Sequence, residues 1–201
     1  STWVHPFLKT LLGCLLRLCF RVRAEGQAHL PTHEPCILVA NHQSYIDGLF
    51  VSMFLTNPFL RRTYYYAKRK HVKKGLLEWL AGRCNVIVVE VGRDVQISIQ
   101  MMVQAVRRGG NLLIFPEGTR SADGQIGDFR STFAAMALEL DVPVIPVAIS
   151  GAIRALPRGK RLPRFLTRVT VRFLPRMSAD NRTSEVNLAE ATRELIAQHL
   201  S

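Results

Sequence analysis

The sequence predicts an α/β fold, in which a mostly parallel β-sheet is flanked by helices and preceded by an N-terminal amphipathic helix. Short apolar runs with the length of buried strands alternate with longer runs that have helical spacing. The chain has 201 residues and is 48% hydrophobic, which is enough for one substantial core. It contains no internal repeat, low-complexity tract or long linker that would divide it.

The first predicted element is an amphipathic helix over residues 1–24. On a helical wheel, Lys9, Gly13, Arg17 and Arg21 fall on one stripe, and apolar residues occupy most of the rest. Because basic residues interrupt the apolar run, the segment suits neither a membrane span nor a cleaved signal peptide. A broadly apolar helix with a narrow basic face is typical of the headgroup boundary of a membrane. Packing of this helix on its own domain is the alternative.

Residues 25–201 form the second predicted unit, in which strands and helices alternate. The predicted strands are short and apolar, and they lie at 36–41, 63–68, 85–91, 111–115, 142–150 and 168–174. The predicted helices have apolar residues at helical spacing, and they lie at 47–55, 72–82, 95–109, 132–140 and 185–200. Alternation of this kind favours a parallel sheet, whose ligand sites lie at the carboxyl ends of the strands.

Charge and cysteine usage restrict the class of protein. The formal net charge of +12 favours an acidic partner, such as nucleic acid, anionic lipid, a phosphorylated substrate or an acidic carrier protein. The four cysteines lack C-x-x-C spacing, which favours buried thiols in a reducing compartment over disulfides or a zinc site. The first residue is serine rather than methionine, which is compatible with a domain excised from a longer chain.

The first informative loop, NHQSYIDG, follows the strand predicted at 36–41. That strand places His42 at the carboxyl edge of the sheet, and Asp47 lies in the first turn of the next helix. A turn between them can bring the carboxylate onto one imidazole nitrogen, where it would fix the tautomer and stabilise the imidazolium. This is the His–Asp half of a catalytic triad without the serine, so a substrate would have to supply the hydroxyl. Helix capping and a metal-ligand role for the histidine are the alternatives; the remaining histidines form no ligand cluster, so no metal site is expected.

The second informative loop, IFPEGTRS, follows the strand predicted at 111–115. Its backbone has to bend at Gly118, which presents Arg120 beside exposed backbone N–H groups. An arginine next to turn amides suits a phosphate, and an ordinary loop with a solvated arginine is the alternative. Together, the two loops predict a general base and a phosphate anchor at the same end of one sheet.

Both loops resemble motifs of one family. NHQSYIDG resembles the H-x4-D motif of the glycerolipid acyltransferases (the 1-acylglycerol-3-phosphate O-acyltransferase family), and FPEGTRS resembles that family's F-P-E-G-T-R-S motif. The order of the motifs and the downstream VPVIPVAI also agree, so the resemblance covers about residues 30–155. It implies transfer of a fatty acyl group from acyl-CoA or an acyl carrier protein to the free hydroxyl of a lysophospholipid such as lysophosphatidic acid. It implies no metal and no bound cofactor, because the acyl thioester is a co-substrate.

The resemblance also implies roles for individual residues. His42 would deprotonate the acceptor hydroxyl, which attacks the thioester directly, and Asp47 would orient His42 and balance its charge. Arg120, with Gly118 and Thr119, would hold the acceptor phosphate.

Glu117 is implicated in acceptor binding by the same resemblance. A carboxylate that faces a phosphate repels it, so orientation of Arg120 or of the loop is the alternative role.

Two positions depart from the pattern of the family. Its second motif places an arginine directly after the strand predicted at 85–91, where this chain has Glu90 and Val91, and Arg93 is the candidate for the same cation. Its F-K-x-G pattern appears as FRST, which keeps a cation as Arg130 and lacks the glycine. These departures bear on headgroup selectivity and leave the chemistry of His42 unaffected.

The expected partners are an anionic membrane surface, a lysophospholipid acceptor and an acyl thioester donor, together with fused or partner domains in a longer chain. Basic segments at 61–74 and 154–172 contain interleaved Phe, Leu and Tyr, which suits anionic lipid, coenzyme A phosphates or an acidic carrier. No nucleic acid is expected, because the chain has no RNP-type, zinc or helix-turn-helix signature.

We therefore expect a membrane-associated acyltransferase of phospholipid biosynthesis, with its active site on the cytoplasmic side. One alternative is the same reaction on glycerol 3-phosphate or another lipid-like hydroxyl. The other is a non-catalytic lipid- or phosphate-binding module.

Overall fold

The computed structural model describes residues 4–68, 75, 79, 82–89, 95–157, 162–178 and 184–200. Within them, a seven-stranded sheet has the order β1-β7-β6-β2-β5-β3-β4. The strands are β1 (Arg21–Glu25), β2 (Ile37–Ala40), β3 (Thr63–Lys68), β4 (Val86–Val89), β5 (Asn111–Ile114), β6 (Val144–Ser150) and β7 (Arg168–Phe173). The helices are α1 (Val4–Cys19), α2 (Asp47–Ser52), α3 (Asn57–Arg61), α5 (Val95–Arg107), α6 (Thr132–Leu140), α7 (Ala152–Ala155) and α8 (Glu185–Ala197), with a short 3-10 helix, η1, at Gln27–His29.

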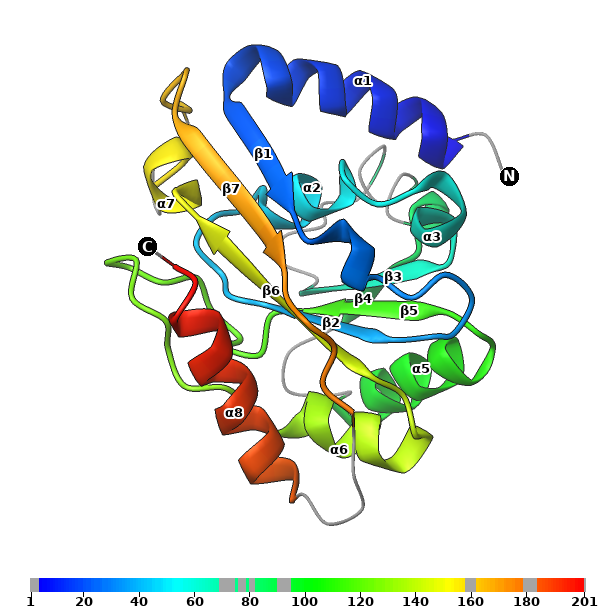
Figure 1. The fold of residues 1–201 in the computed structure, drawn as a ribbon. Helices are drawn as coiled ribbons and strands as arrows, with labels where there is room; N and C mark the ends of the chain where they lie inside the picture. The colour runs from blue at the N-terminus through cyan, green and yellow to red at the C-terminus, as the bar shows by residue number, and fades with distance from the viewer. Residues whose placement is uncertain are drawn as a thin grey trace.

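The strands run in two directions. β2 pairs in parallel with β5 and β6, and β3 pairs in parallel with β5 and β4. β7 is antiparallel to β6, and β1 is parallel to β7. The carboxyl ends of β2 and β6 therefore lie at the same edge of the sheet as the amino ends of β1 and β7 (Figure 1). The predicted mostly parallel α/β sheet is confirmed, and the reversed direction of β1 and β7 at one side of the sheet was not predicted.

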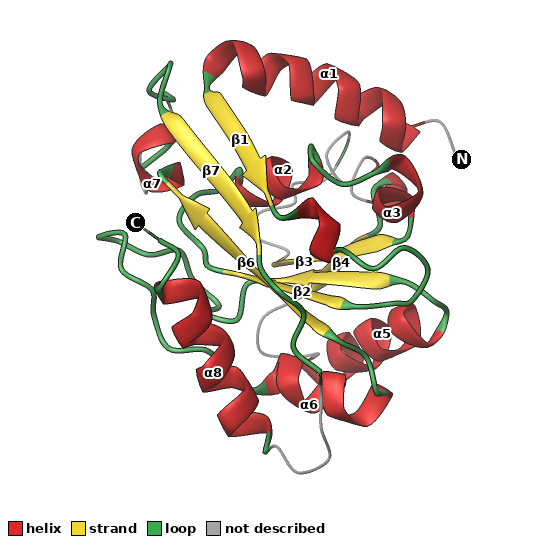
Figure 2. Ribbon diagram, viewed as in Figure 1, coloured by secondary structure: helices red, strands yellow, loops and turns green. Residues whose placement is uncertain are grey.

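Helices cover both faces of the sheet, with α1, α2 and α3 on one face and α5, α6 and α8 on the other (Figure 2). β2 lies between these two layers, and all four of its residues are completely buried. Leu38 and Ala40 belong to the core on the α1 side, whereas Ile37 and Val39 belong to the core on the α6 side. Burial on both faces explains why this strand is apolar at every position.

The predicted helix over residues 1–24 is too long. α1 ends at Cys19, where the N–H of Phe20 closes the last turn on the oxygen of Leu16 at 2.7 Å. Residues 21–25 instead form β1, which alternates exposed and half-buried side chains along its pairing with β7. Among the described residues, no helix has both the length and the apolar composition needed to cross a bilayer.

The predicted basic stripe of α1 is divided in the structure, because Arg17 is exposed whereas Lys9 is turned toward the domain. The Lys9 ammonium points inward and donates to the backbone oxygen of Leu55. Burial lowers the pKa of Lys9, and the charge of Arg17 lowers it further. Gly13 is also turned inward, because a Cβ there would lie 4.0 Å from Cβ of Met53. The face of α1 that is turned away from the domain is therefore an apolar one.

The helix predicted at 47–55 is three residues too long, and the helix predicted at 72–82 is described only in part. The helix predicted at 47–55 stops at Ser52, and the chain then starts α3, which has Pro58 in its first turn. Most of the helix predicted at 72–82 lies outside the described residues.

The prediction that all cysteines are buried is wrong for three of them. Cys36 is completely buried, and burial raises the pKa of its thiol to about 12. Cys14 is exposed on the outer side of α1, and Cys19 and Cys84 are half-buried. All four are free thiols.

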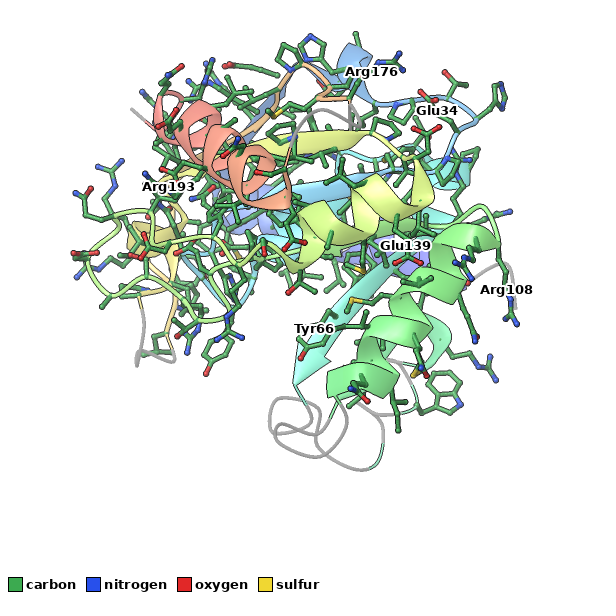
Figure 3. The ribbon with its side chains drawn as sticks, turned by 90° about the horizontal axis from the view of Figure 1, so that it is seen from below. Glu34, Tyr66, Arg108, Glu139, Arg176 and Arg193 are labelled. Carbon is green, nitrogen blue, oxygen red and sulfur yellow. The ribbon has the colours of Figure 1, made fainter. Side chains whose placement is uncertain are left out.

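Surface ion pairs join segments that flank the sheet. Arg176, beyond β7, donates to Glu34, before β2, at 2.7 Å, and Figure 3 shows these side chains next to each other. Both partners are about half exposed, so we expect this pair to contribute at most about 1 kcal/mol to the free energy of unfolding.

Gly26, at the end of β1, provides a test of this packing. It has φ of 74°, and a Cβ there would lie 2.0 Å from the backbone oxygen of Phe173. We therefore expect Gly26→Ala to lower the free energy of unfolding by about 2 kcal/mol or more, as measured by urea denaturation. Gly82→Ala, whose Cβ would meet no atom within 4 Å, is the matched control and should change it by less than about 1 kcal/mol. An unchanged midpoint for Gly26→Ala would contradict the close contact between η1 and the end of β7.

Candidate active site

The chain after β2 is held to β6 by the side chain of Asn41. Its amide nitrogen donates to the backbone oxygen of Ile149 at 3.0 Å, and its amide oxygen accepts from the N–H of Ile149 at 2.7 Å. Asn41 is buried, so both hydrogen bonds are shielded from water. This link continues the pairing of β2 with β6 and places His42 at the carboxyl edge of the sheet.

His42 and Asp47 are in direct contact, as their spacing predicted. Nδ1 of His42 lies 2.9 Å from Oδ2 of Asp47. The same oxygen accepts from the backbone N–H of Gln43 at 2.7 Å and of Ser44 at 2.6 Å. Oδ1 of Asp47 has no donor among the described residues, so all the hydrogen bonds to this carboxylate converge on the oxygen that faces His42.

Burial sets the electrostatics of this pair. Asp47 is completely buried, which raises the pKa of its carboxyl, while hydrogen bonds from His42, Ser44 and Gln43 act in the opposite direction. A carboxylate can only accept, so Nδ1 of His42 has to carry the proton that lies between them. Nε2 is then the nitrogen with a free lone pair. The His42 side chain is 22% exposed, which leaves part of the ring open to a substrate.

The FPEGTRS loop wraps around the main chain and the ring of His42. Oε1 of Glu117 accepts from the N–H of His42 at 2.7 Å, and the N–H of Ser121 donates to the oxygen of His42 at 2.8 Å. The ring of Phe115 stacks on the imidazole with 4.3 Å between centroids and an interplanar angle of 25°. The two loops that were predicted to share one edge of the sheet therefore form one structure.

Glu117 contacts backbone on both of its oxygens. Besides His42, it accepts from the N–H of Gly127 at 3.2 Å through Oε2. Burial raises the pKa of Glu117, and these two backbone hydrogen bonds oppose the shift. This geometry favours the expectation that Glu117 orients the loop over the expectation that it faces a phosphate.

The rest of the FPEGTRS loop places two cations beside a tight turn. Gly118 has φ of 67°, and its N–H bonds to the oxygen of Phe115 at 3.1 Å. The Arg130 guanidinium packs over this turn, since a Cβ at Gly118 would lie 3.4 Å from its Cζ. Cζ of Arg120 lies 3.2 Å from the ring centroid of Tyr45, which belongs to the His42 loop.

The remaining predicted residues are less central to this arrangement. Thr119 is exposed at the tip of the loop, and Arg93 lies outside the described residues. Among the described residues, no group of three or more His, Cys, Asp or Glu side chains is arranged to hold a metal ion.

Three residues in the site were not predicted to act there: Asn41, Tyr45 and Phe115. A polar residue directly after a fully buried strand, as Asn41 is, is the one local signal that could have indicated such a link.

Comparisons with known proteins match most of the chain. Residues 21–150 match a family model described as Acyltransferase. A 1-acyl-sn-glycerol-3-phosphate acyltransferase from Limnanthes alba is 31% identical over 177 residues, which cover 86% of this chain and 61% of that protein. A lyso-ornithine lipid O-acyltransferase from Pseudomonas aeruginosa is 35% identical over 141 residues, which cover 68% of this chain and 51% of that protein. The chain thus spans only part of the length of these relatives.

A solved structure is similar over almost the whole chain. It is the crystal structure of the 1-acyl-sn-glycerophosphate (LPA) acyltransferase PlsC from Thermotoga maritima, with a TM-score of 0.80 and 25% sequence identity. The match covers 98% of this chain and 76% of that chain, so it includes α1 as well as the sheet.

The raised pKa of Glu117 predicts a pH-dependent contribution to stability. The unfolded chain loses this proton near the ordinary glutamate pKa of 4.5, whereas the folded protein keeps it to a higher pH. Between these two values the folded state binds more protons, so the contribution of Glu117 to stability falls as pH rises. We expect the free energy of unfolding of Glu117→Gln, minus that of the wild type, to increase with pH across this window. Urea denaturation from pH 4 to pH 7 measures it, and a difference that is constant or decreases would contradict the burial of this carboxyl.

Proposed function

The chain belongs to the acyltransferase family, and we propose that it transfers a fatty acyl group from an acyl thioester to the free hydroxyl of a lysophospholipid, with lysophosphatidic acid as the representative acceptor. The observation that carries this proposal is the contact of 2.9 Å between His42 and the buried Asp47 at the carboxyl edge of the sheet. The names of the relatives support it, because they are acyltransferases of 1-acyl-sn-glycerol 3-phosphate and of a lyso-lipid.

In the proposed reaction, Nε2 of His42 takes the proton of the acceptor hydroxyl. The hydroxyl oxygen attacks the thioester carbonyl and forms a tetrahedral intermediate. This intermediate collapses to the new ester and expels the thiolate, which takes the proton from Nε2 and leaves as the thiol. Asp47 stabilises the imidazolium that exists between the two proton transfers. A positioned base of this kind typically accelerates a reaction about 10²–10⁴-fold.

The proposed phosphate site is the turn that contains Gly118, Thr119 and Arg120. The guanidinium of Arg120 can bind phosphate oxygens in pairs, and turn amides can add further donors. The stacking of Arg120 on Tyr45 joins this site to the loop of the base. Glu117 would then serve the reaction through the loop, because both of its oxygens accept from backbone N–H groups.

The donor in this proposal is acyl-CoA or an acyl carrier protein. The thioester carries an activated acyl group, and the histidine supplies the base, so the reaction requires neither a metal nor a resident cofactor. Free thiols in the chain agree with a cytoplasmic active site, and the charge of +12 agrees with work at an anionic membrane surface.

A different lipid acceptor is the second candidate. The relative from Pseudomonas aeruginosa is named for a lyso-ornithine lipid and has the higher identity of the two relatives above, 35% against 31%. The acceptor panel should therefore include a lyso-ornithine lipid and glycerol 3-phosphate beside lysophosphatidic acid.

Substitution of His42 tests the proposed chemistry. We expect His42→Ala to reduce acceptor-dependent thiol release from oleoyl-CoA at least about 100-fold, because the base is lost, while binding of the lysophospholipid is retained. His33→Ala, which changes an exposed histidine before β2, is the matched control and should behave as the wild type. If no acceptor supports thiol release, acyl carrier protein donors follow. Retained lipid binding without turnover on any donor would instead favour a non-catalytic binding module.

Arg120 tests the proposed phosphate site. We expect Arg120→Ala to raise the KM for lysophosphatidic acid about 10- to 100-fold with a smaller change in kcat, because a charge-assisted contact to the phosphate is lost. With monoacylglycerol, an acceptor without phosphate, the KM should not change. Arg108→Ala is the control, since this exposed residue precedes the amino end of β5 at the opposite edge of the sheet (Figure 3). An equal loss with both acceptors would contradict phosphate binding by Arg120.

A further inference from the structure

Two segments expose large apolar side chains on the same part of the molecule. The first is the outer face of α1, and the second is the loop before β7, residues 162–166. Their exposed fractions are 55% for Leu11, 53% for Leu15, 77% for Leu18, 82% for Leu162, 65% for Phe165 and 64% for Leu166. Contiguous exposed apolar surface of this kind marks an interaction site.

The exposure on α1 follows from how the helix is packed. Leu11, Leu15 and Leu18 have the spacing of a single helical face. The opposite face is fixed to the domain through the buried Leu16 and the inward hydrogen bond of Lys9. The helix thus turns its lysine toward the domain and exposes its leucines. A helix face that contacts only water would be expected to expose the charged residue and bury the leucines.

The loop at 162–166 is also held in a defined conformation. The N–H of Arg164 donates to the oxygen of Ala155 at 2.8 Å, and the hydroxyl of Thr167 donates to the oxygen of Arg164 at 2.7 Å. Leu166 has φ of 59°, in the left-handed region that leucine rarely adopts, while its side chain remains exposed. Because backbone strain clusters at functional sites, this conformation supports a binding role for the exposed side chain.

A hydrogen bond joins the two segments into one surface. The N–H of Leu166 donates to the oxygen of Cys19, the last residue of α1, at 2.7 Å. This contact puts the loop beside the last turn of α1, next to Leu18. Figure 1 shows the end of α1 and the segment directly before β7 at the same end of the molecule.

The charged residues of the two described segments that form this surface are all positive. Arg17, Arg21, Arg164 and Arg168 are exposed, and Arg21 and Arg168 are neighbours in the pairing of β1 with β7. The described segments 9–21 and 162–168 contain no acidic residue. Leucine and phenylalanine surrounded by arginine match an anionic bilayer, in which acyl chains take the apolar side chains and phosphates take the cations. Two copies of this surface would repel each other through the same arginines.

The surface lies at the edge of the sheet that carries His42. β1 and β7 begin at the edge where β2 and β6 end, because the two pairs run in opposite directions. α7, which precedes the loop, is tied to the catalytic loop: the N–H of Ile153 donates to the Gln43 side chain at 3.3 Å, and the Ser44 hydroxyl donates to the oxygen of Leu156 at 3.2 Å.

We propose that residues 162–168 are a second membrane-docking element, which forms one platform with the outer face of α1 and seats the active-site edge on an anionic phospholipid bilayer. The platform consists of Leu11, Leu15, Leu18, Leu162, Phe165 and Leu166 with the flanking Arg17, Arg21, Arg164 and Arg168. A lipid acceptor would then reach His42 from the bilayer surface without crossing water. Docking itself does not depend on which acceptor is acylated.

Vesicle co-sedimentation in the absence of substrate tests this proposal. The vesicles contain equal amounts of phosphatidylcholine and phosphatidylglycerol, with phosphatidylcholine alone as the uncharged comparison. We expect the double variant Leu162→Ser with Phe165→Ser to bind the anionic vesicles at least about 10-fold more weakly than the wild type, because apolar area is withdrawn from the bilayer. The double variant Leu15→Ser with Leu18→Ser should lose binding similarly. Val186→Ser, which changes a residue of α8 with 62% exposure, is the matched control and should bind as the wild type.

Two further measurements test the roles of the flanking arginines and the insertion of the loop into the bilayer. Arg164→Gln with Arg168→Gln should remove most of the preference for anionic vesicles and weaken the dependence of binding on salt. Phe165→Trp should add fluorescence that brominated lipids quench. Circular dichroism and thiol release with detergent-dispersed acceptor, both unchanged, would show that the variants are folded.

Wild-type binding by the loop double variant, or no quenching of Phe165→Trp, would overturn the proposal. So would loss of a dimer in gel filtration upon substitution of the loop, since the surface would then be an interface between copies of the chain. Failure of acyl transfer in every assay, with vesicle binding as expected, would contradict the proposed function and leave the docking platform intact.

Discussion

The structure around the site depends on one buried carboxylate oxygen. Oδ2 of Asp47 accepts from the His42 ring and from the N–H groups of Gln43 and Ser44. A completely buried charge is costly unless donors surround it, so the chain between the histidine and the aspartate has to turn back on itself, and α2 has to begin there. The orientation of the imidazole follows from this turn. The FPEGTRS loop forms hydrogen bonds to the main chain of His42. The position of the proposed phosphate site therefore also depends on the Asp47 carboxylate.

The second organising feature is the reversal of strand direction between β6 and β7. A fully parallel sheet would send β1 and β7 away from the site, whereas the antiparallel pairing brings their amino ends to the edge where β2 ends. That edge consequently holds His42, the FPEGTRS loop with Arg120, the end of α1 and the apolar loop before β7. The proposed transfer to a lysophospholipid would use these features together, because such an acceptor has its hydroxyl and phosphate at a bilayer surface and its chain inside the bilayer. The covered lysine and the uncovered leucines of α1 fit the same arrangement.

Features that depend on residues close together in the sequence could be predicted. β3 and α6 have the predicted bounds, because alternation and apolar spacing are local signals, and the contact of His42 with Asp47 follows from a spacing of five residues. The shared edge of the two loops was predicted from the parallel sheet, but several other features that need a distant partner were missed. β1 is recognisable only from its pairing with β7, and Lys9 turns inward because its acceptor, Leu55, comes from a remote part of the chain. The contact of Phe115 with the His42 ring and the link from Asn41 to Ile149 likewise join segments far apart in sequence.

The proposed role of His42 as a base depends on which nitrogen of its ring carries the proton. Two-bond couplings between the ring protons and the ring nitrogens, measured by NMR on protein labelled with ¹⁵N histidine, report which nitrogen carries the proton in the neutral ring. His42→Ala provides the assignment of the signals. We expect a proton on Nδ1, held by Asp47, and an unprotonated Nε2 that can accept the proton of a hydroxyl. A neutral ring with its proton on Nε2 would contradict this role, because that nitrogen could then not act as the base.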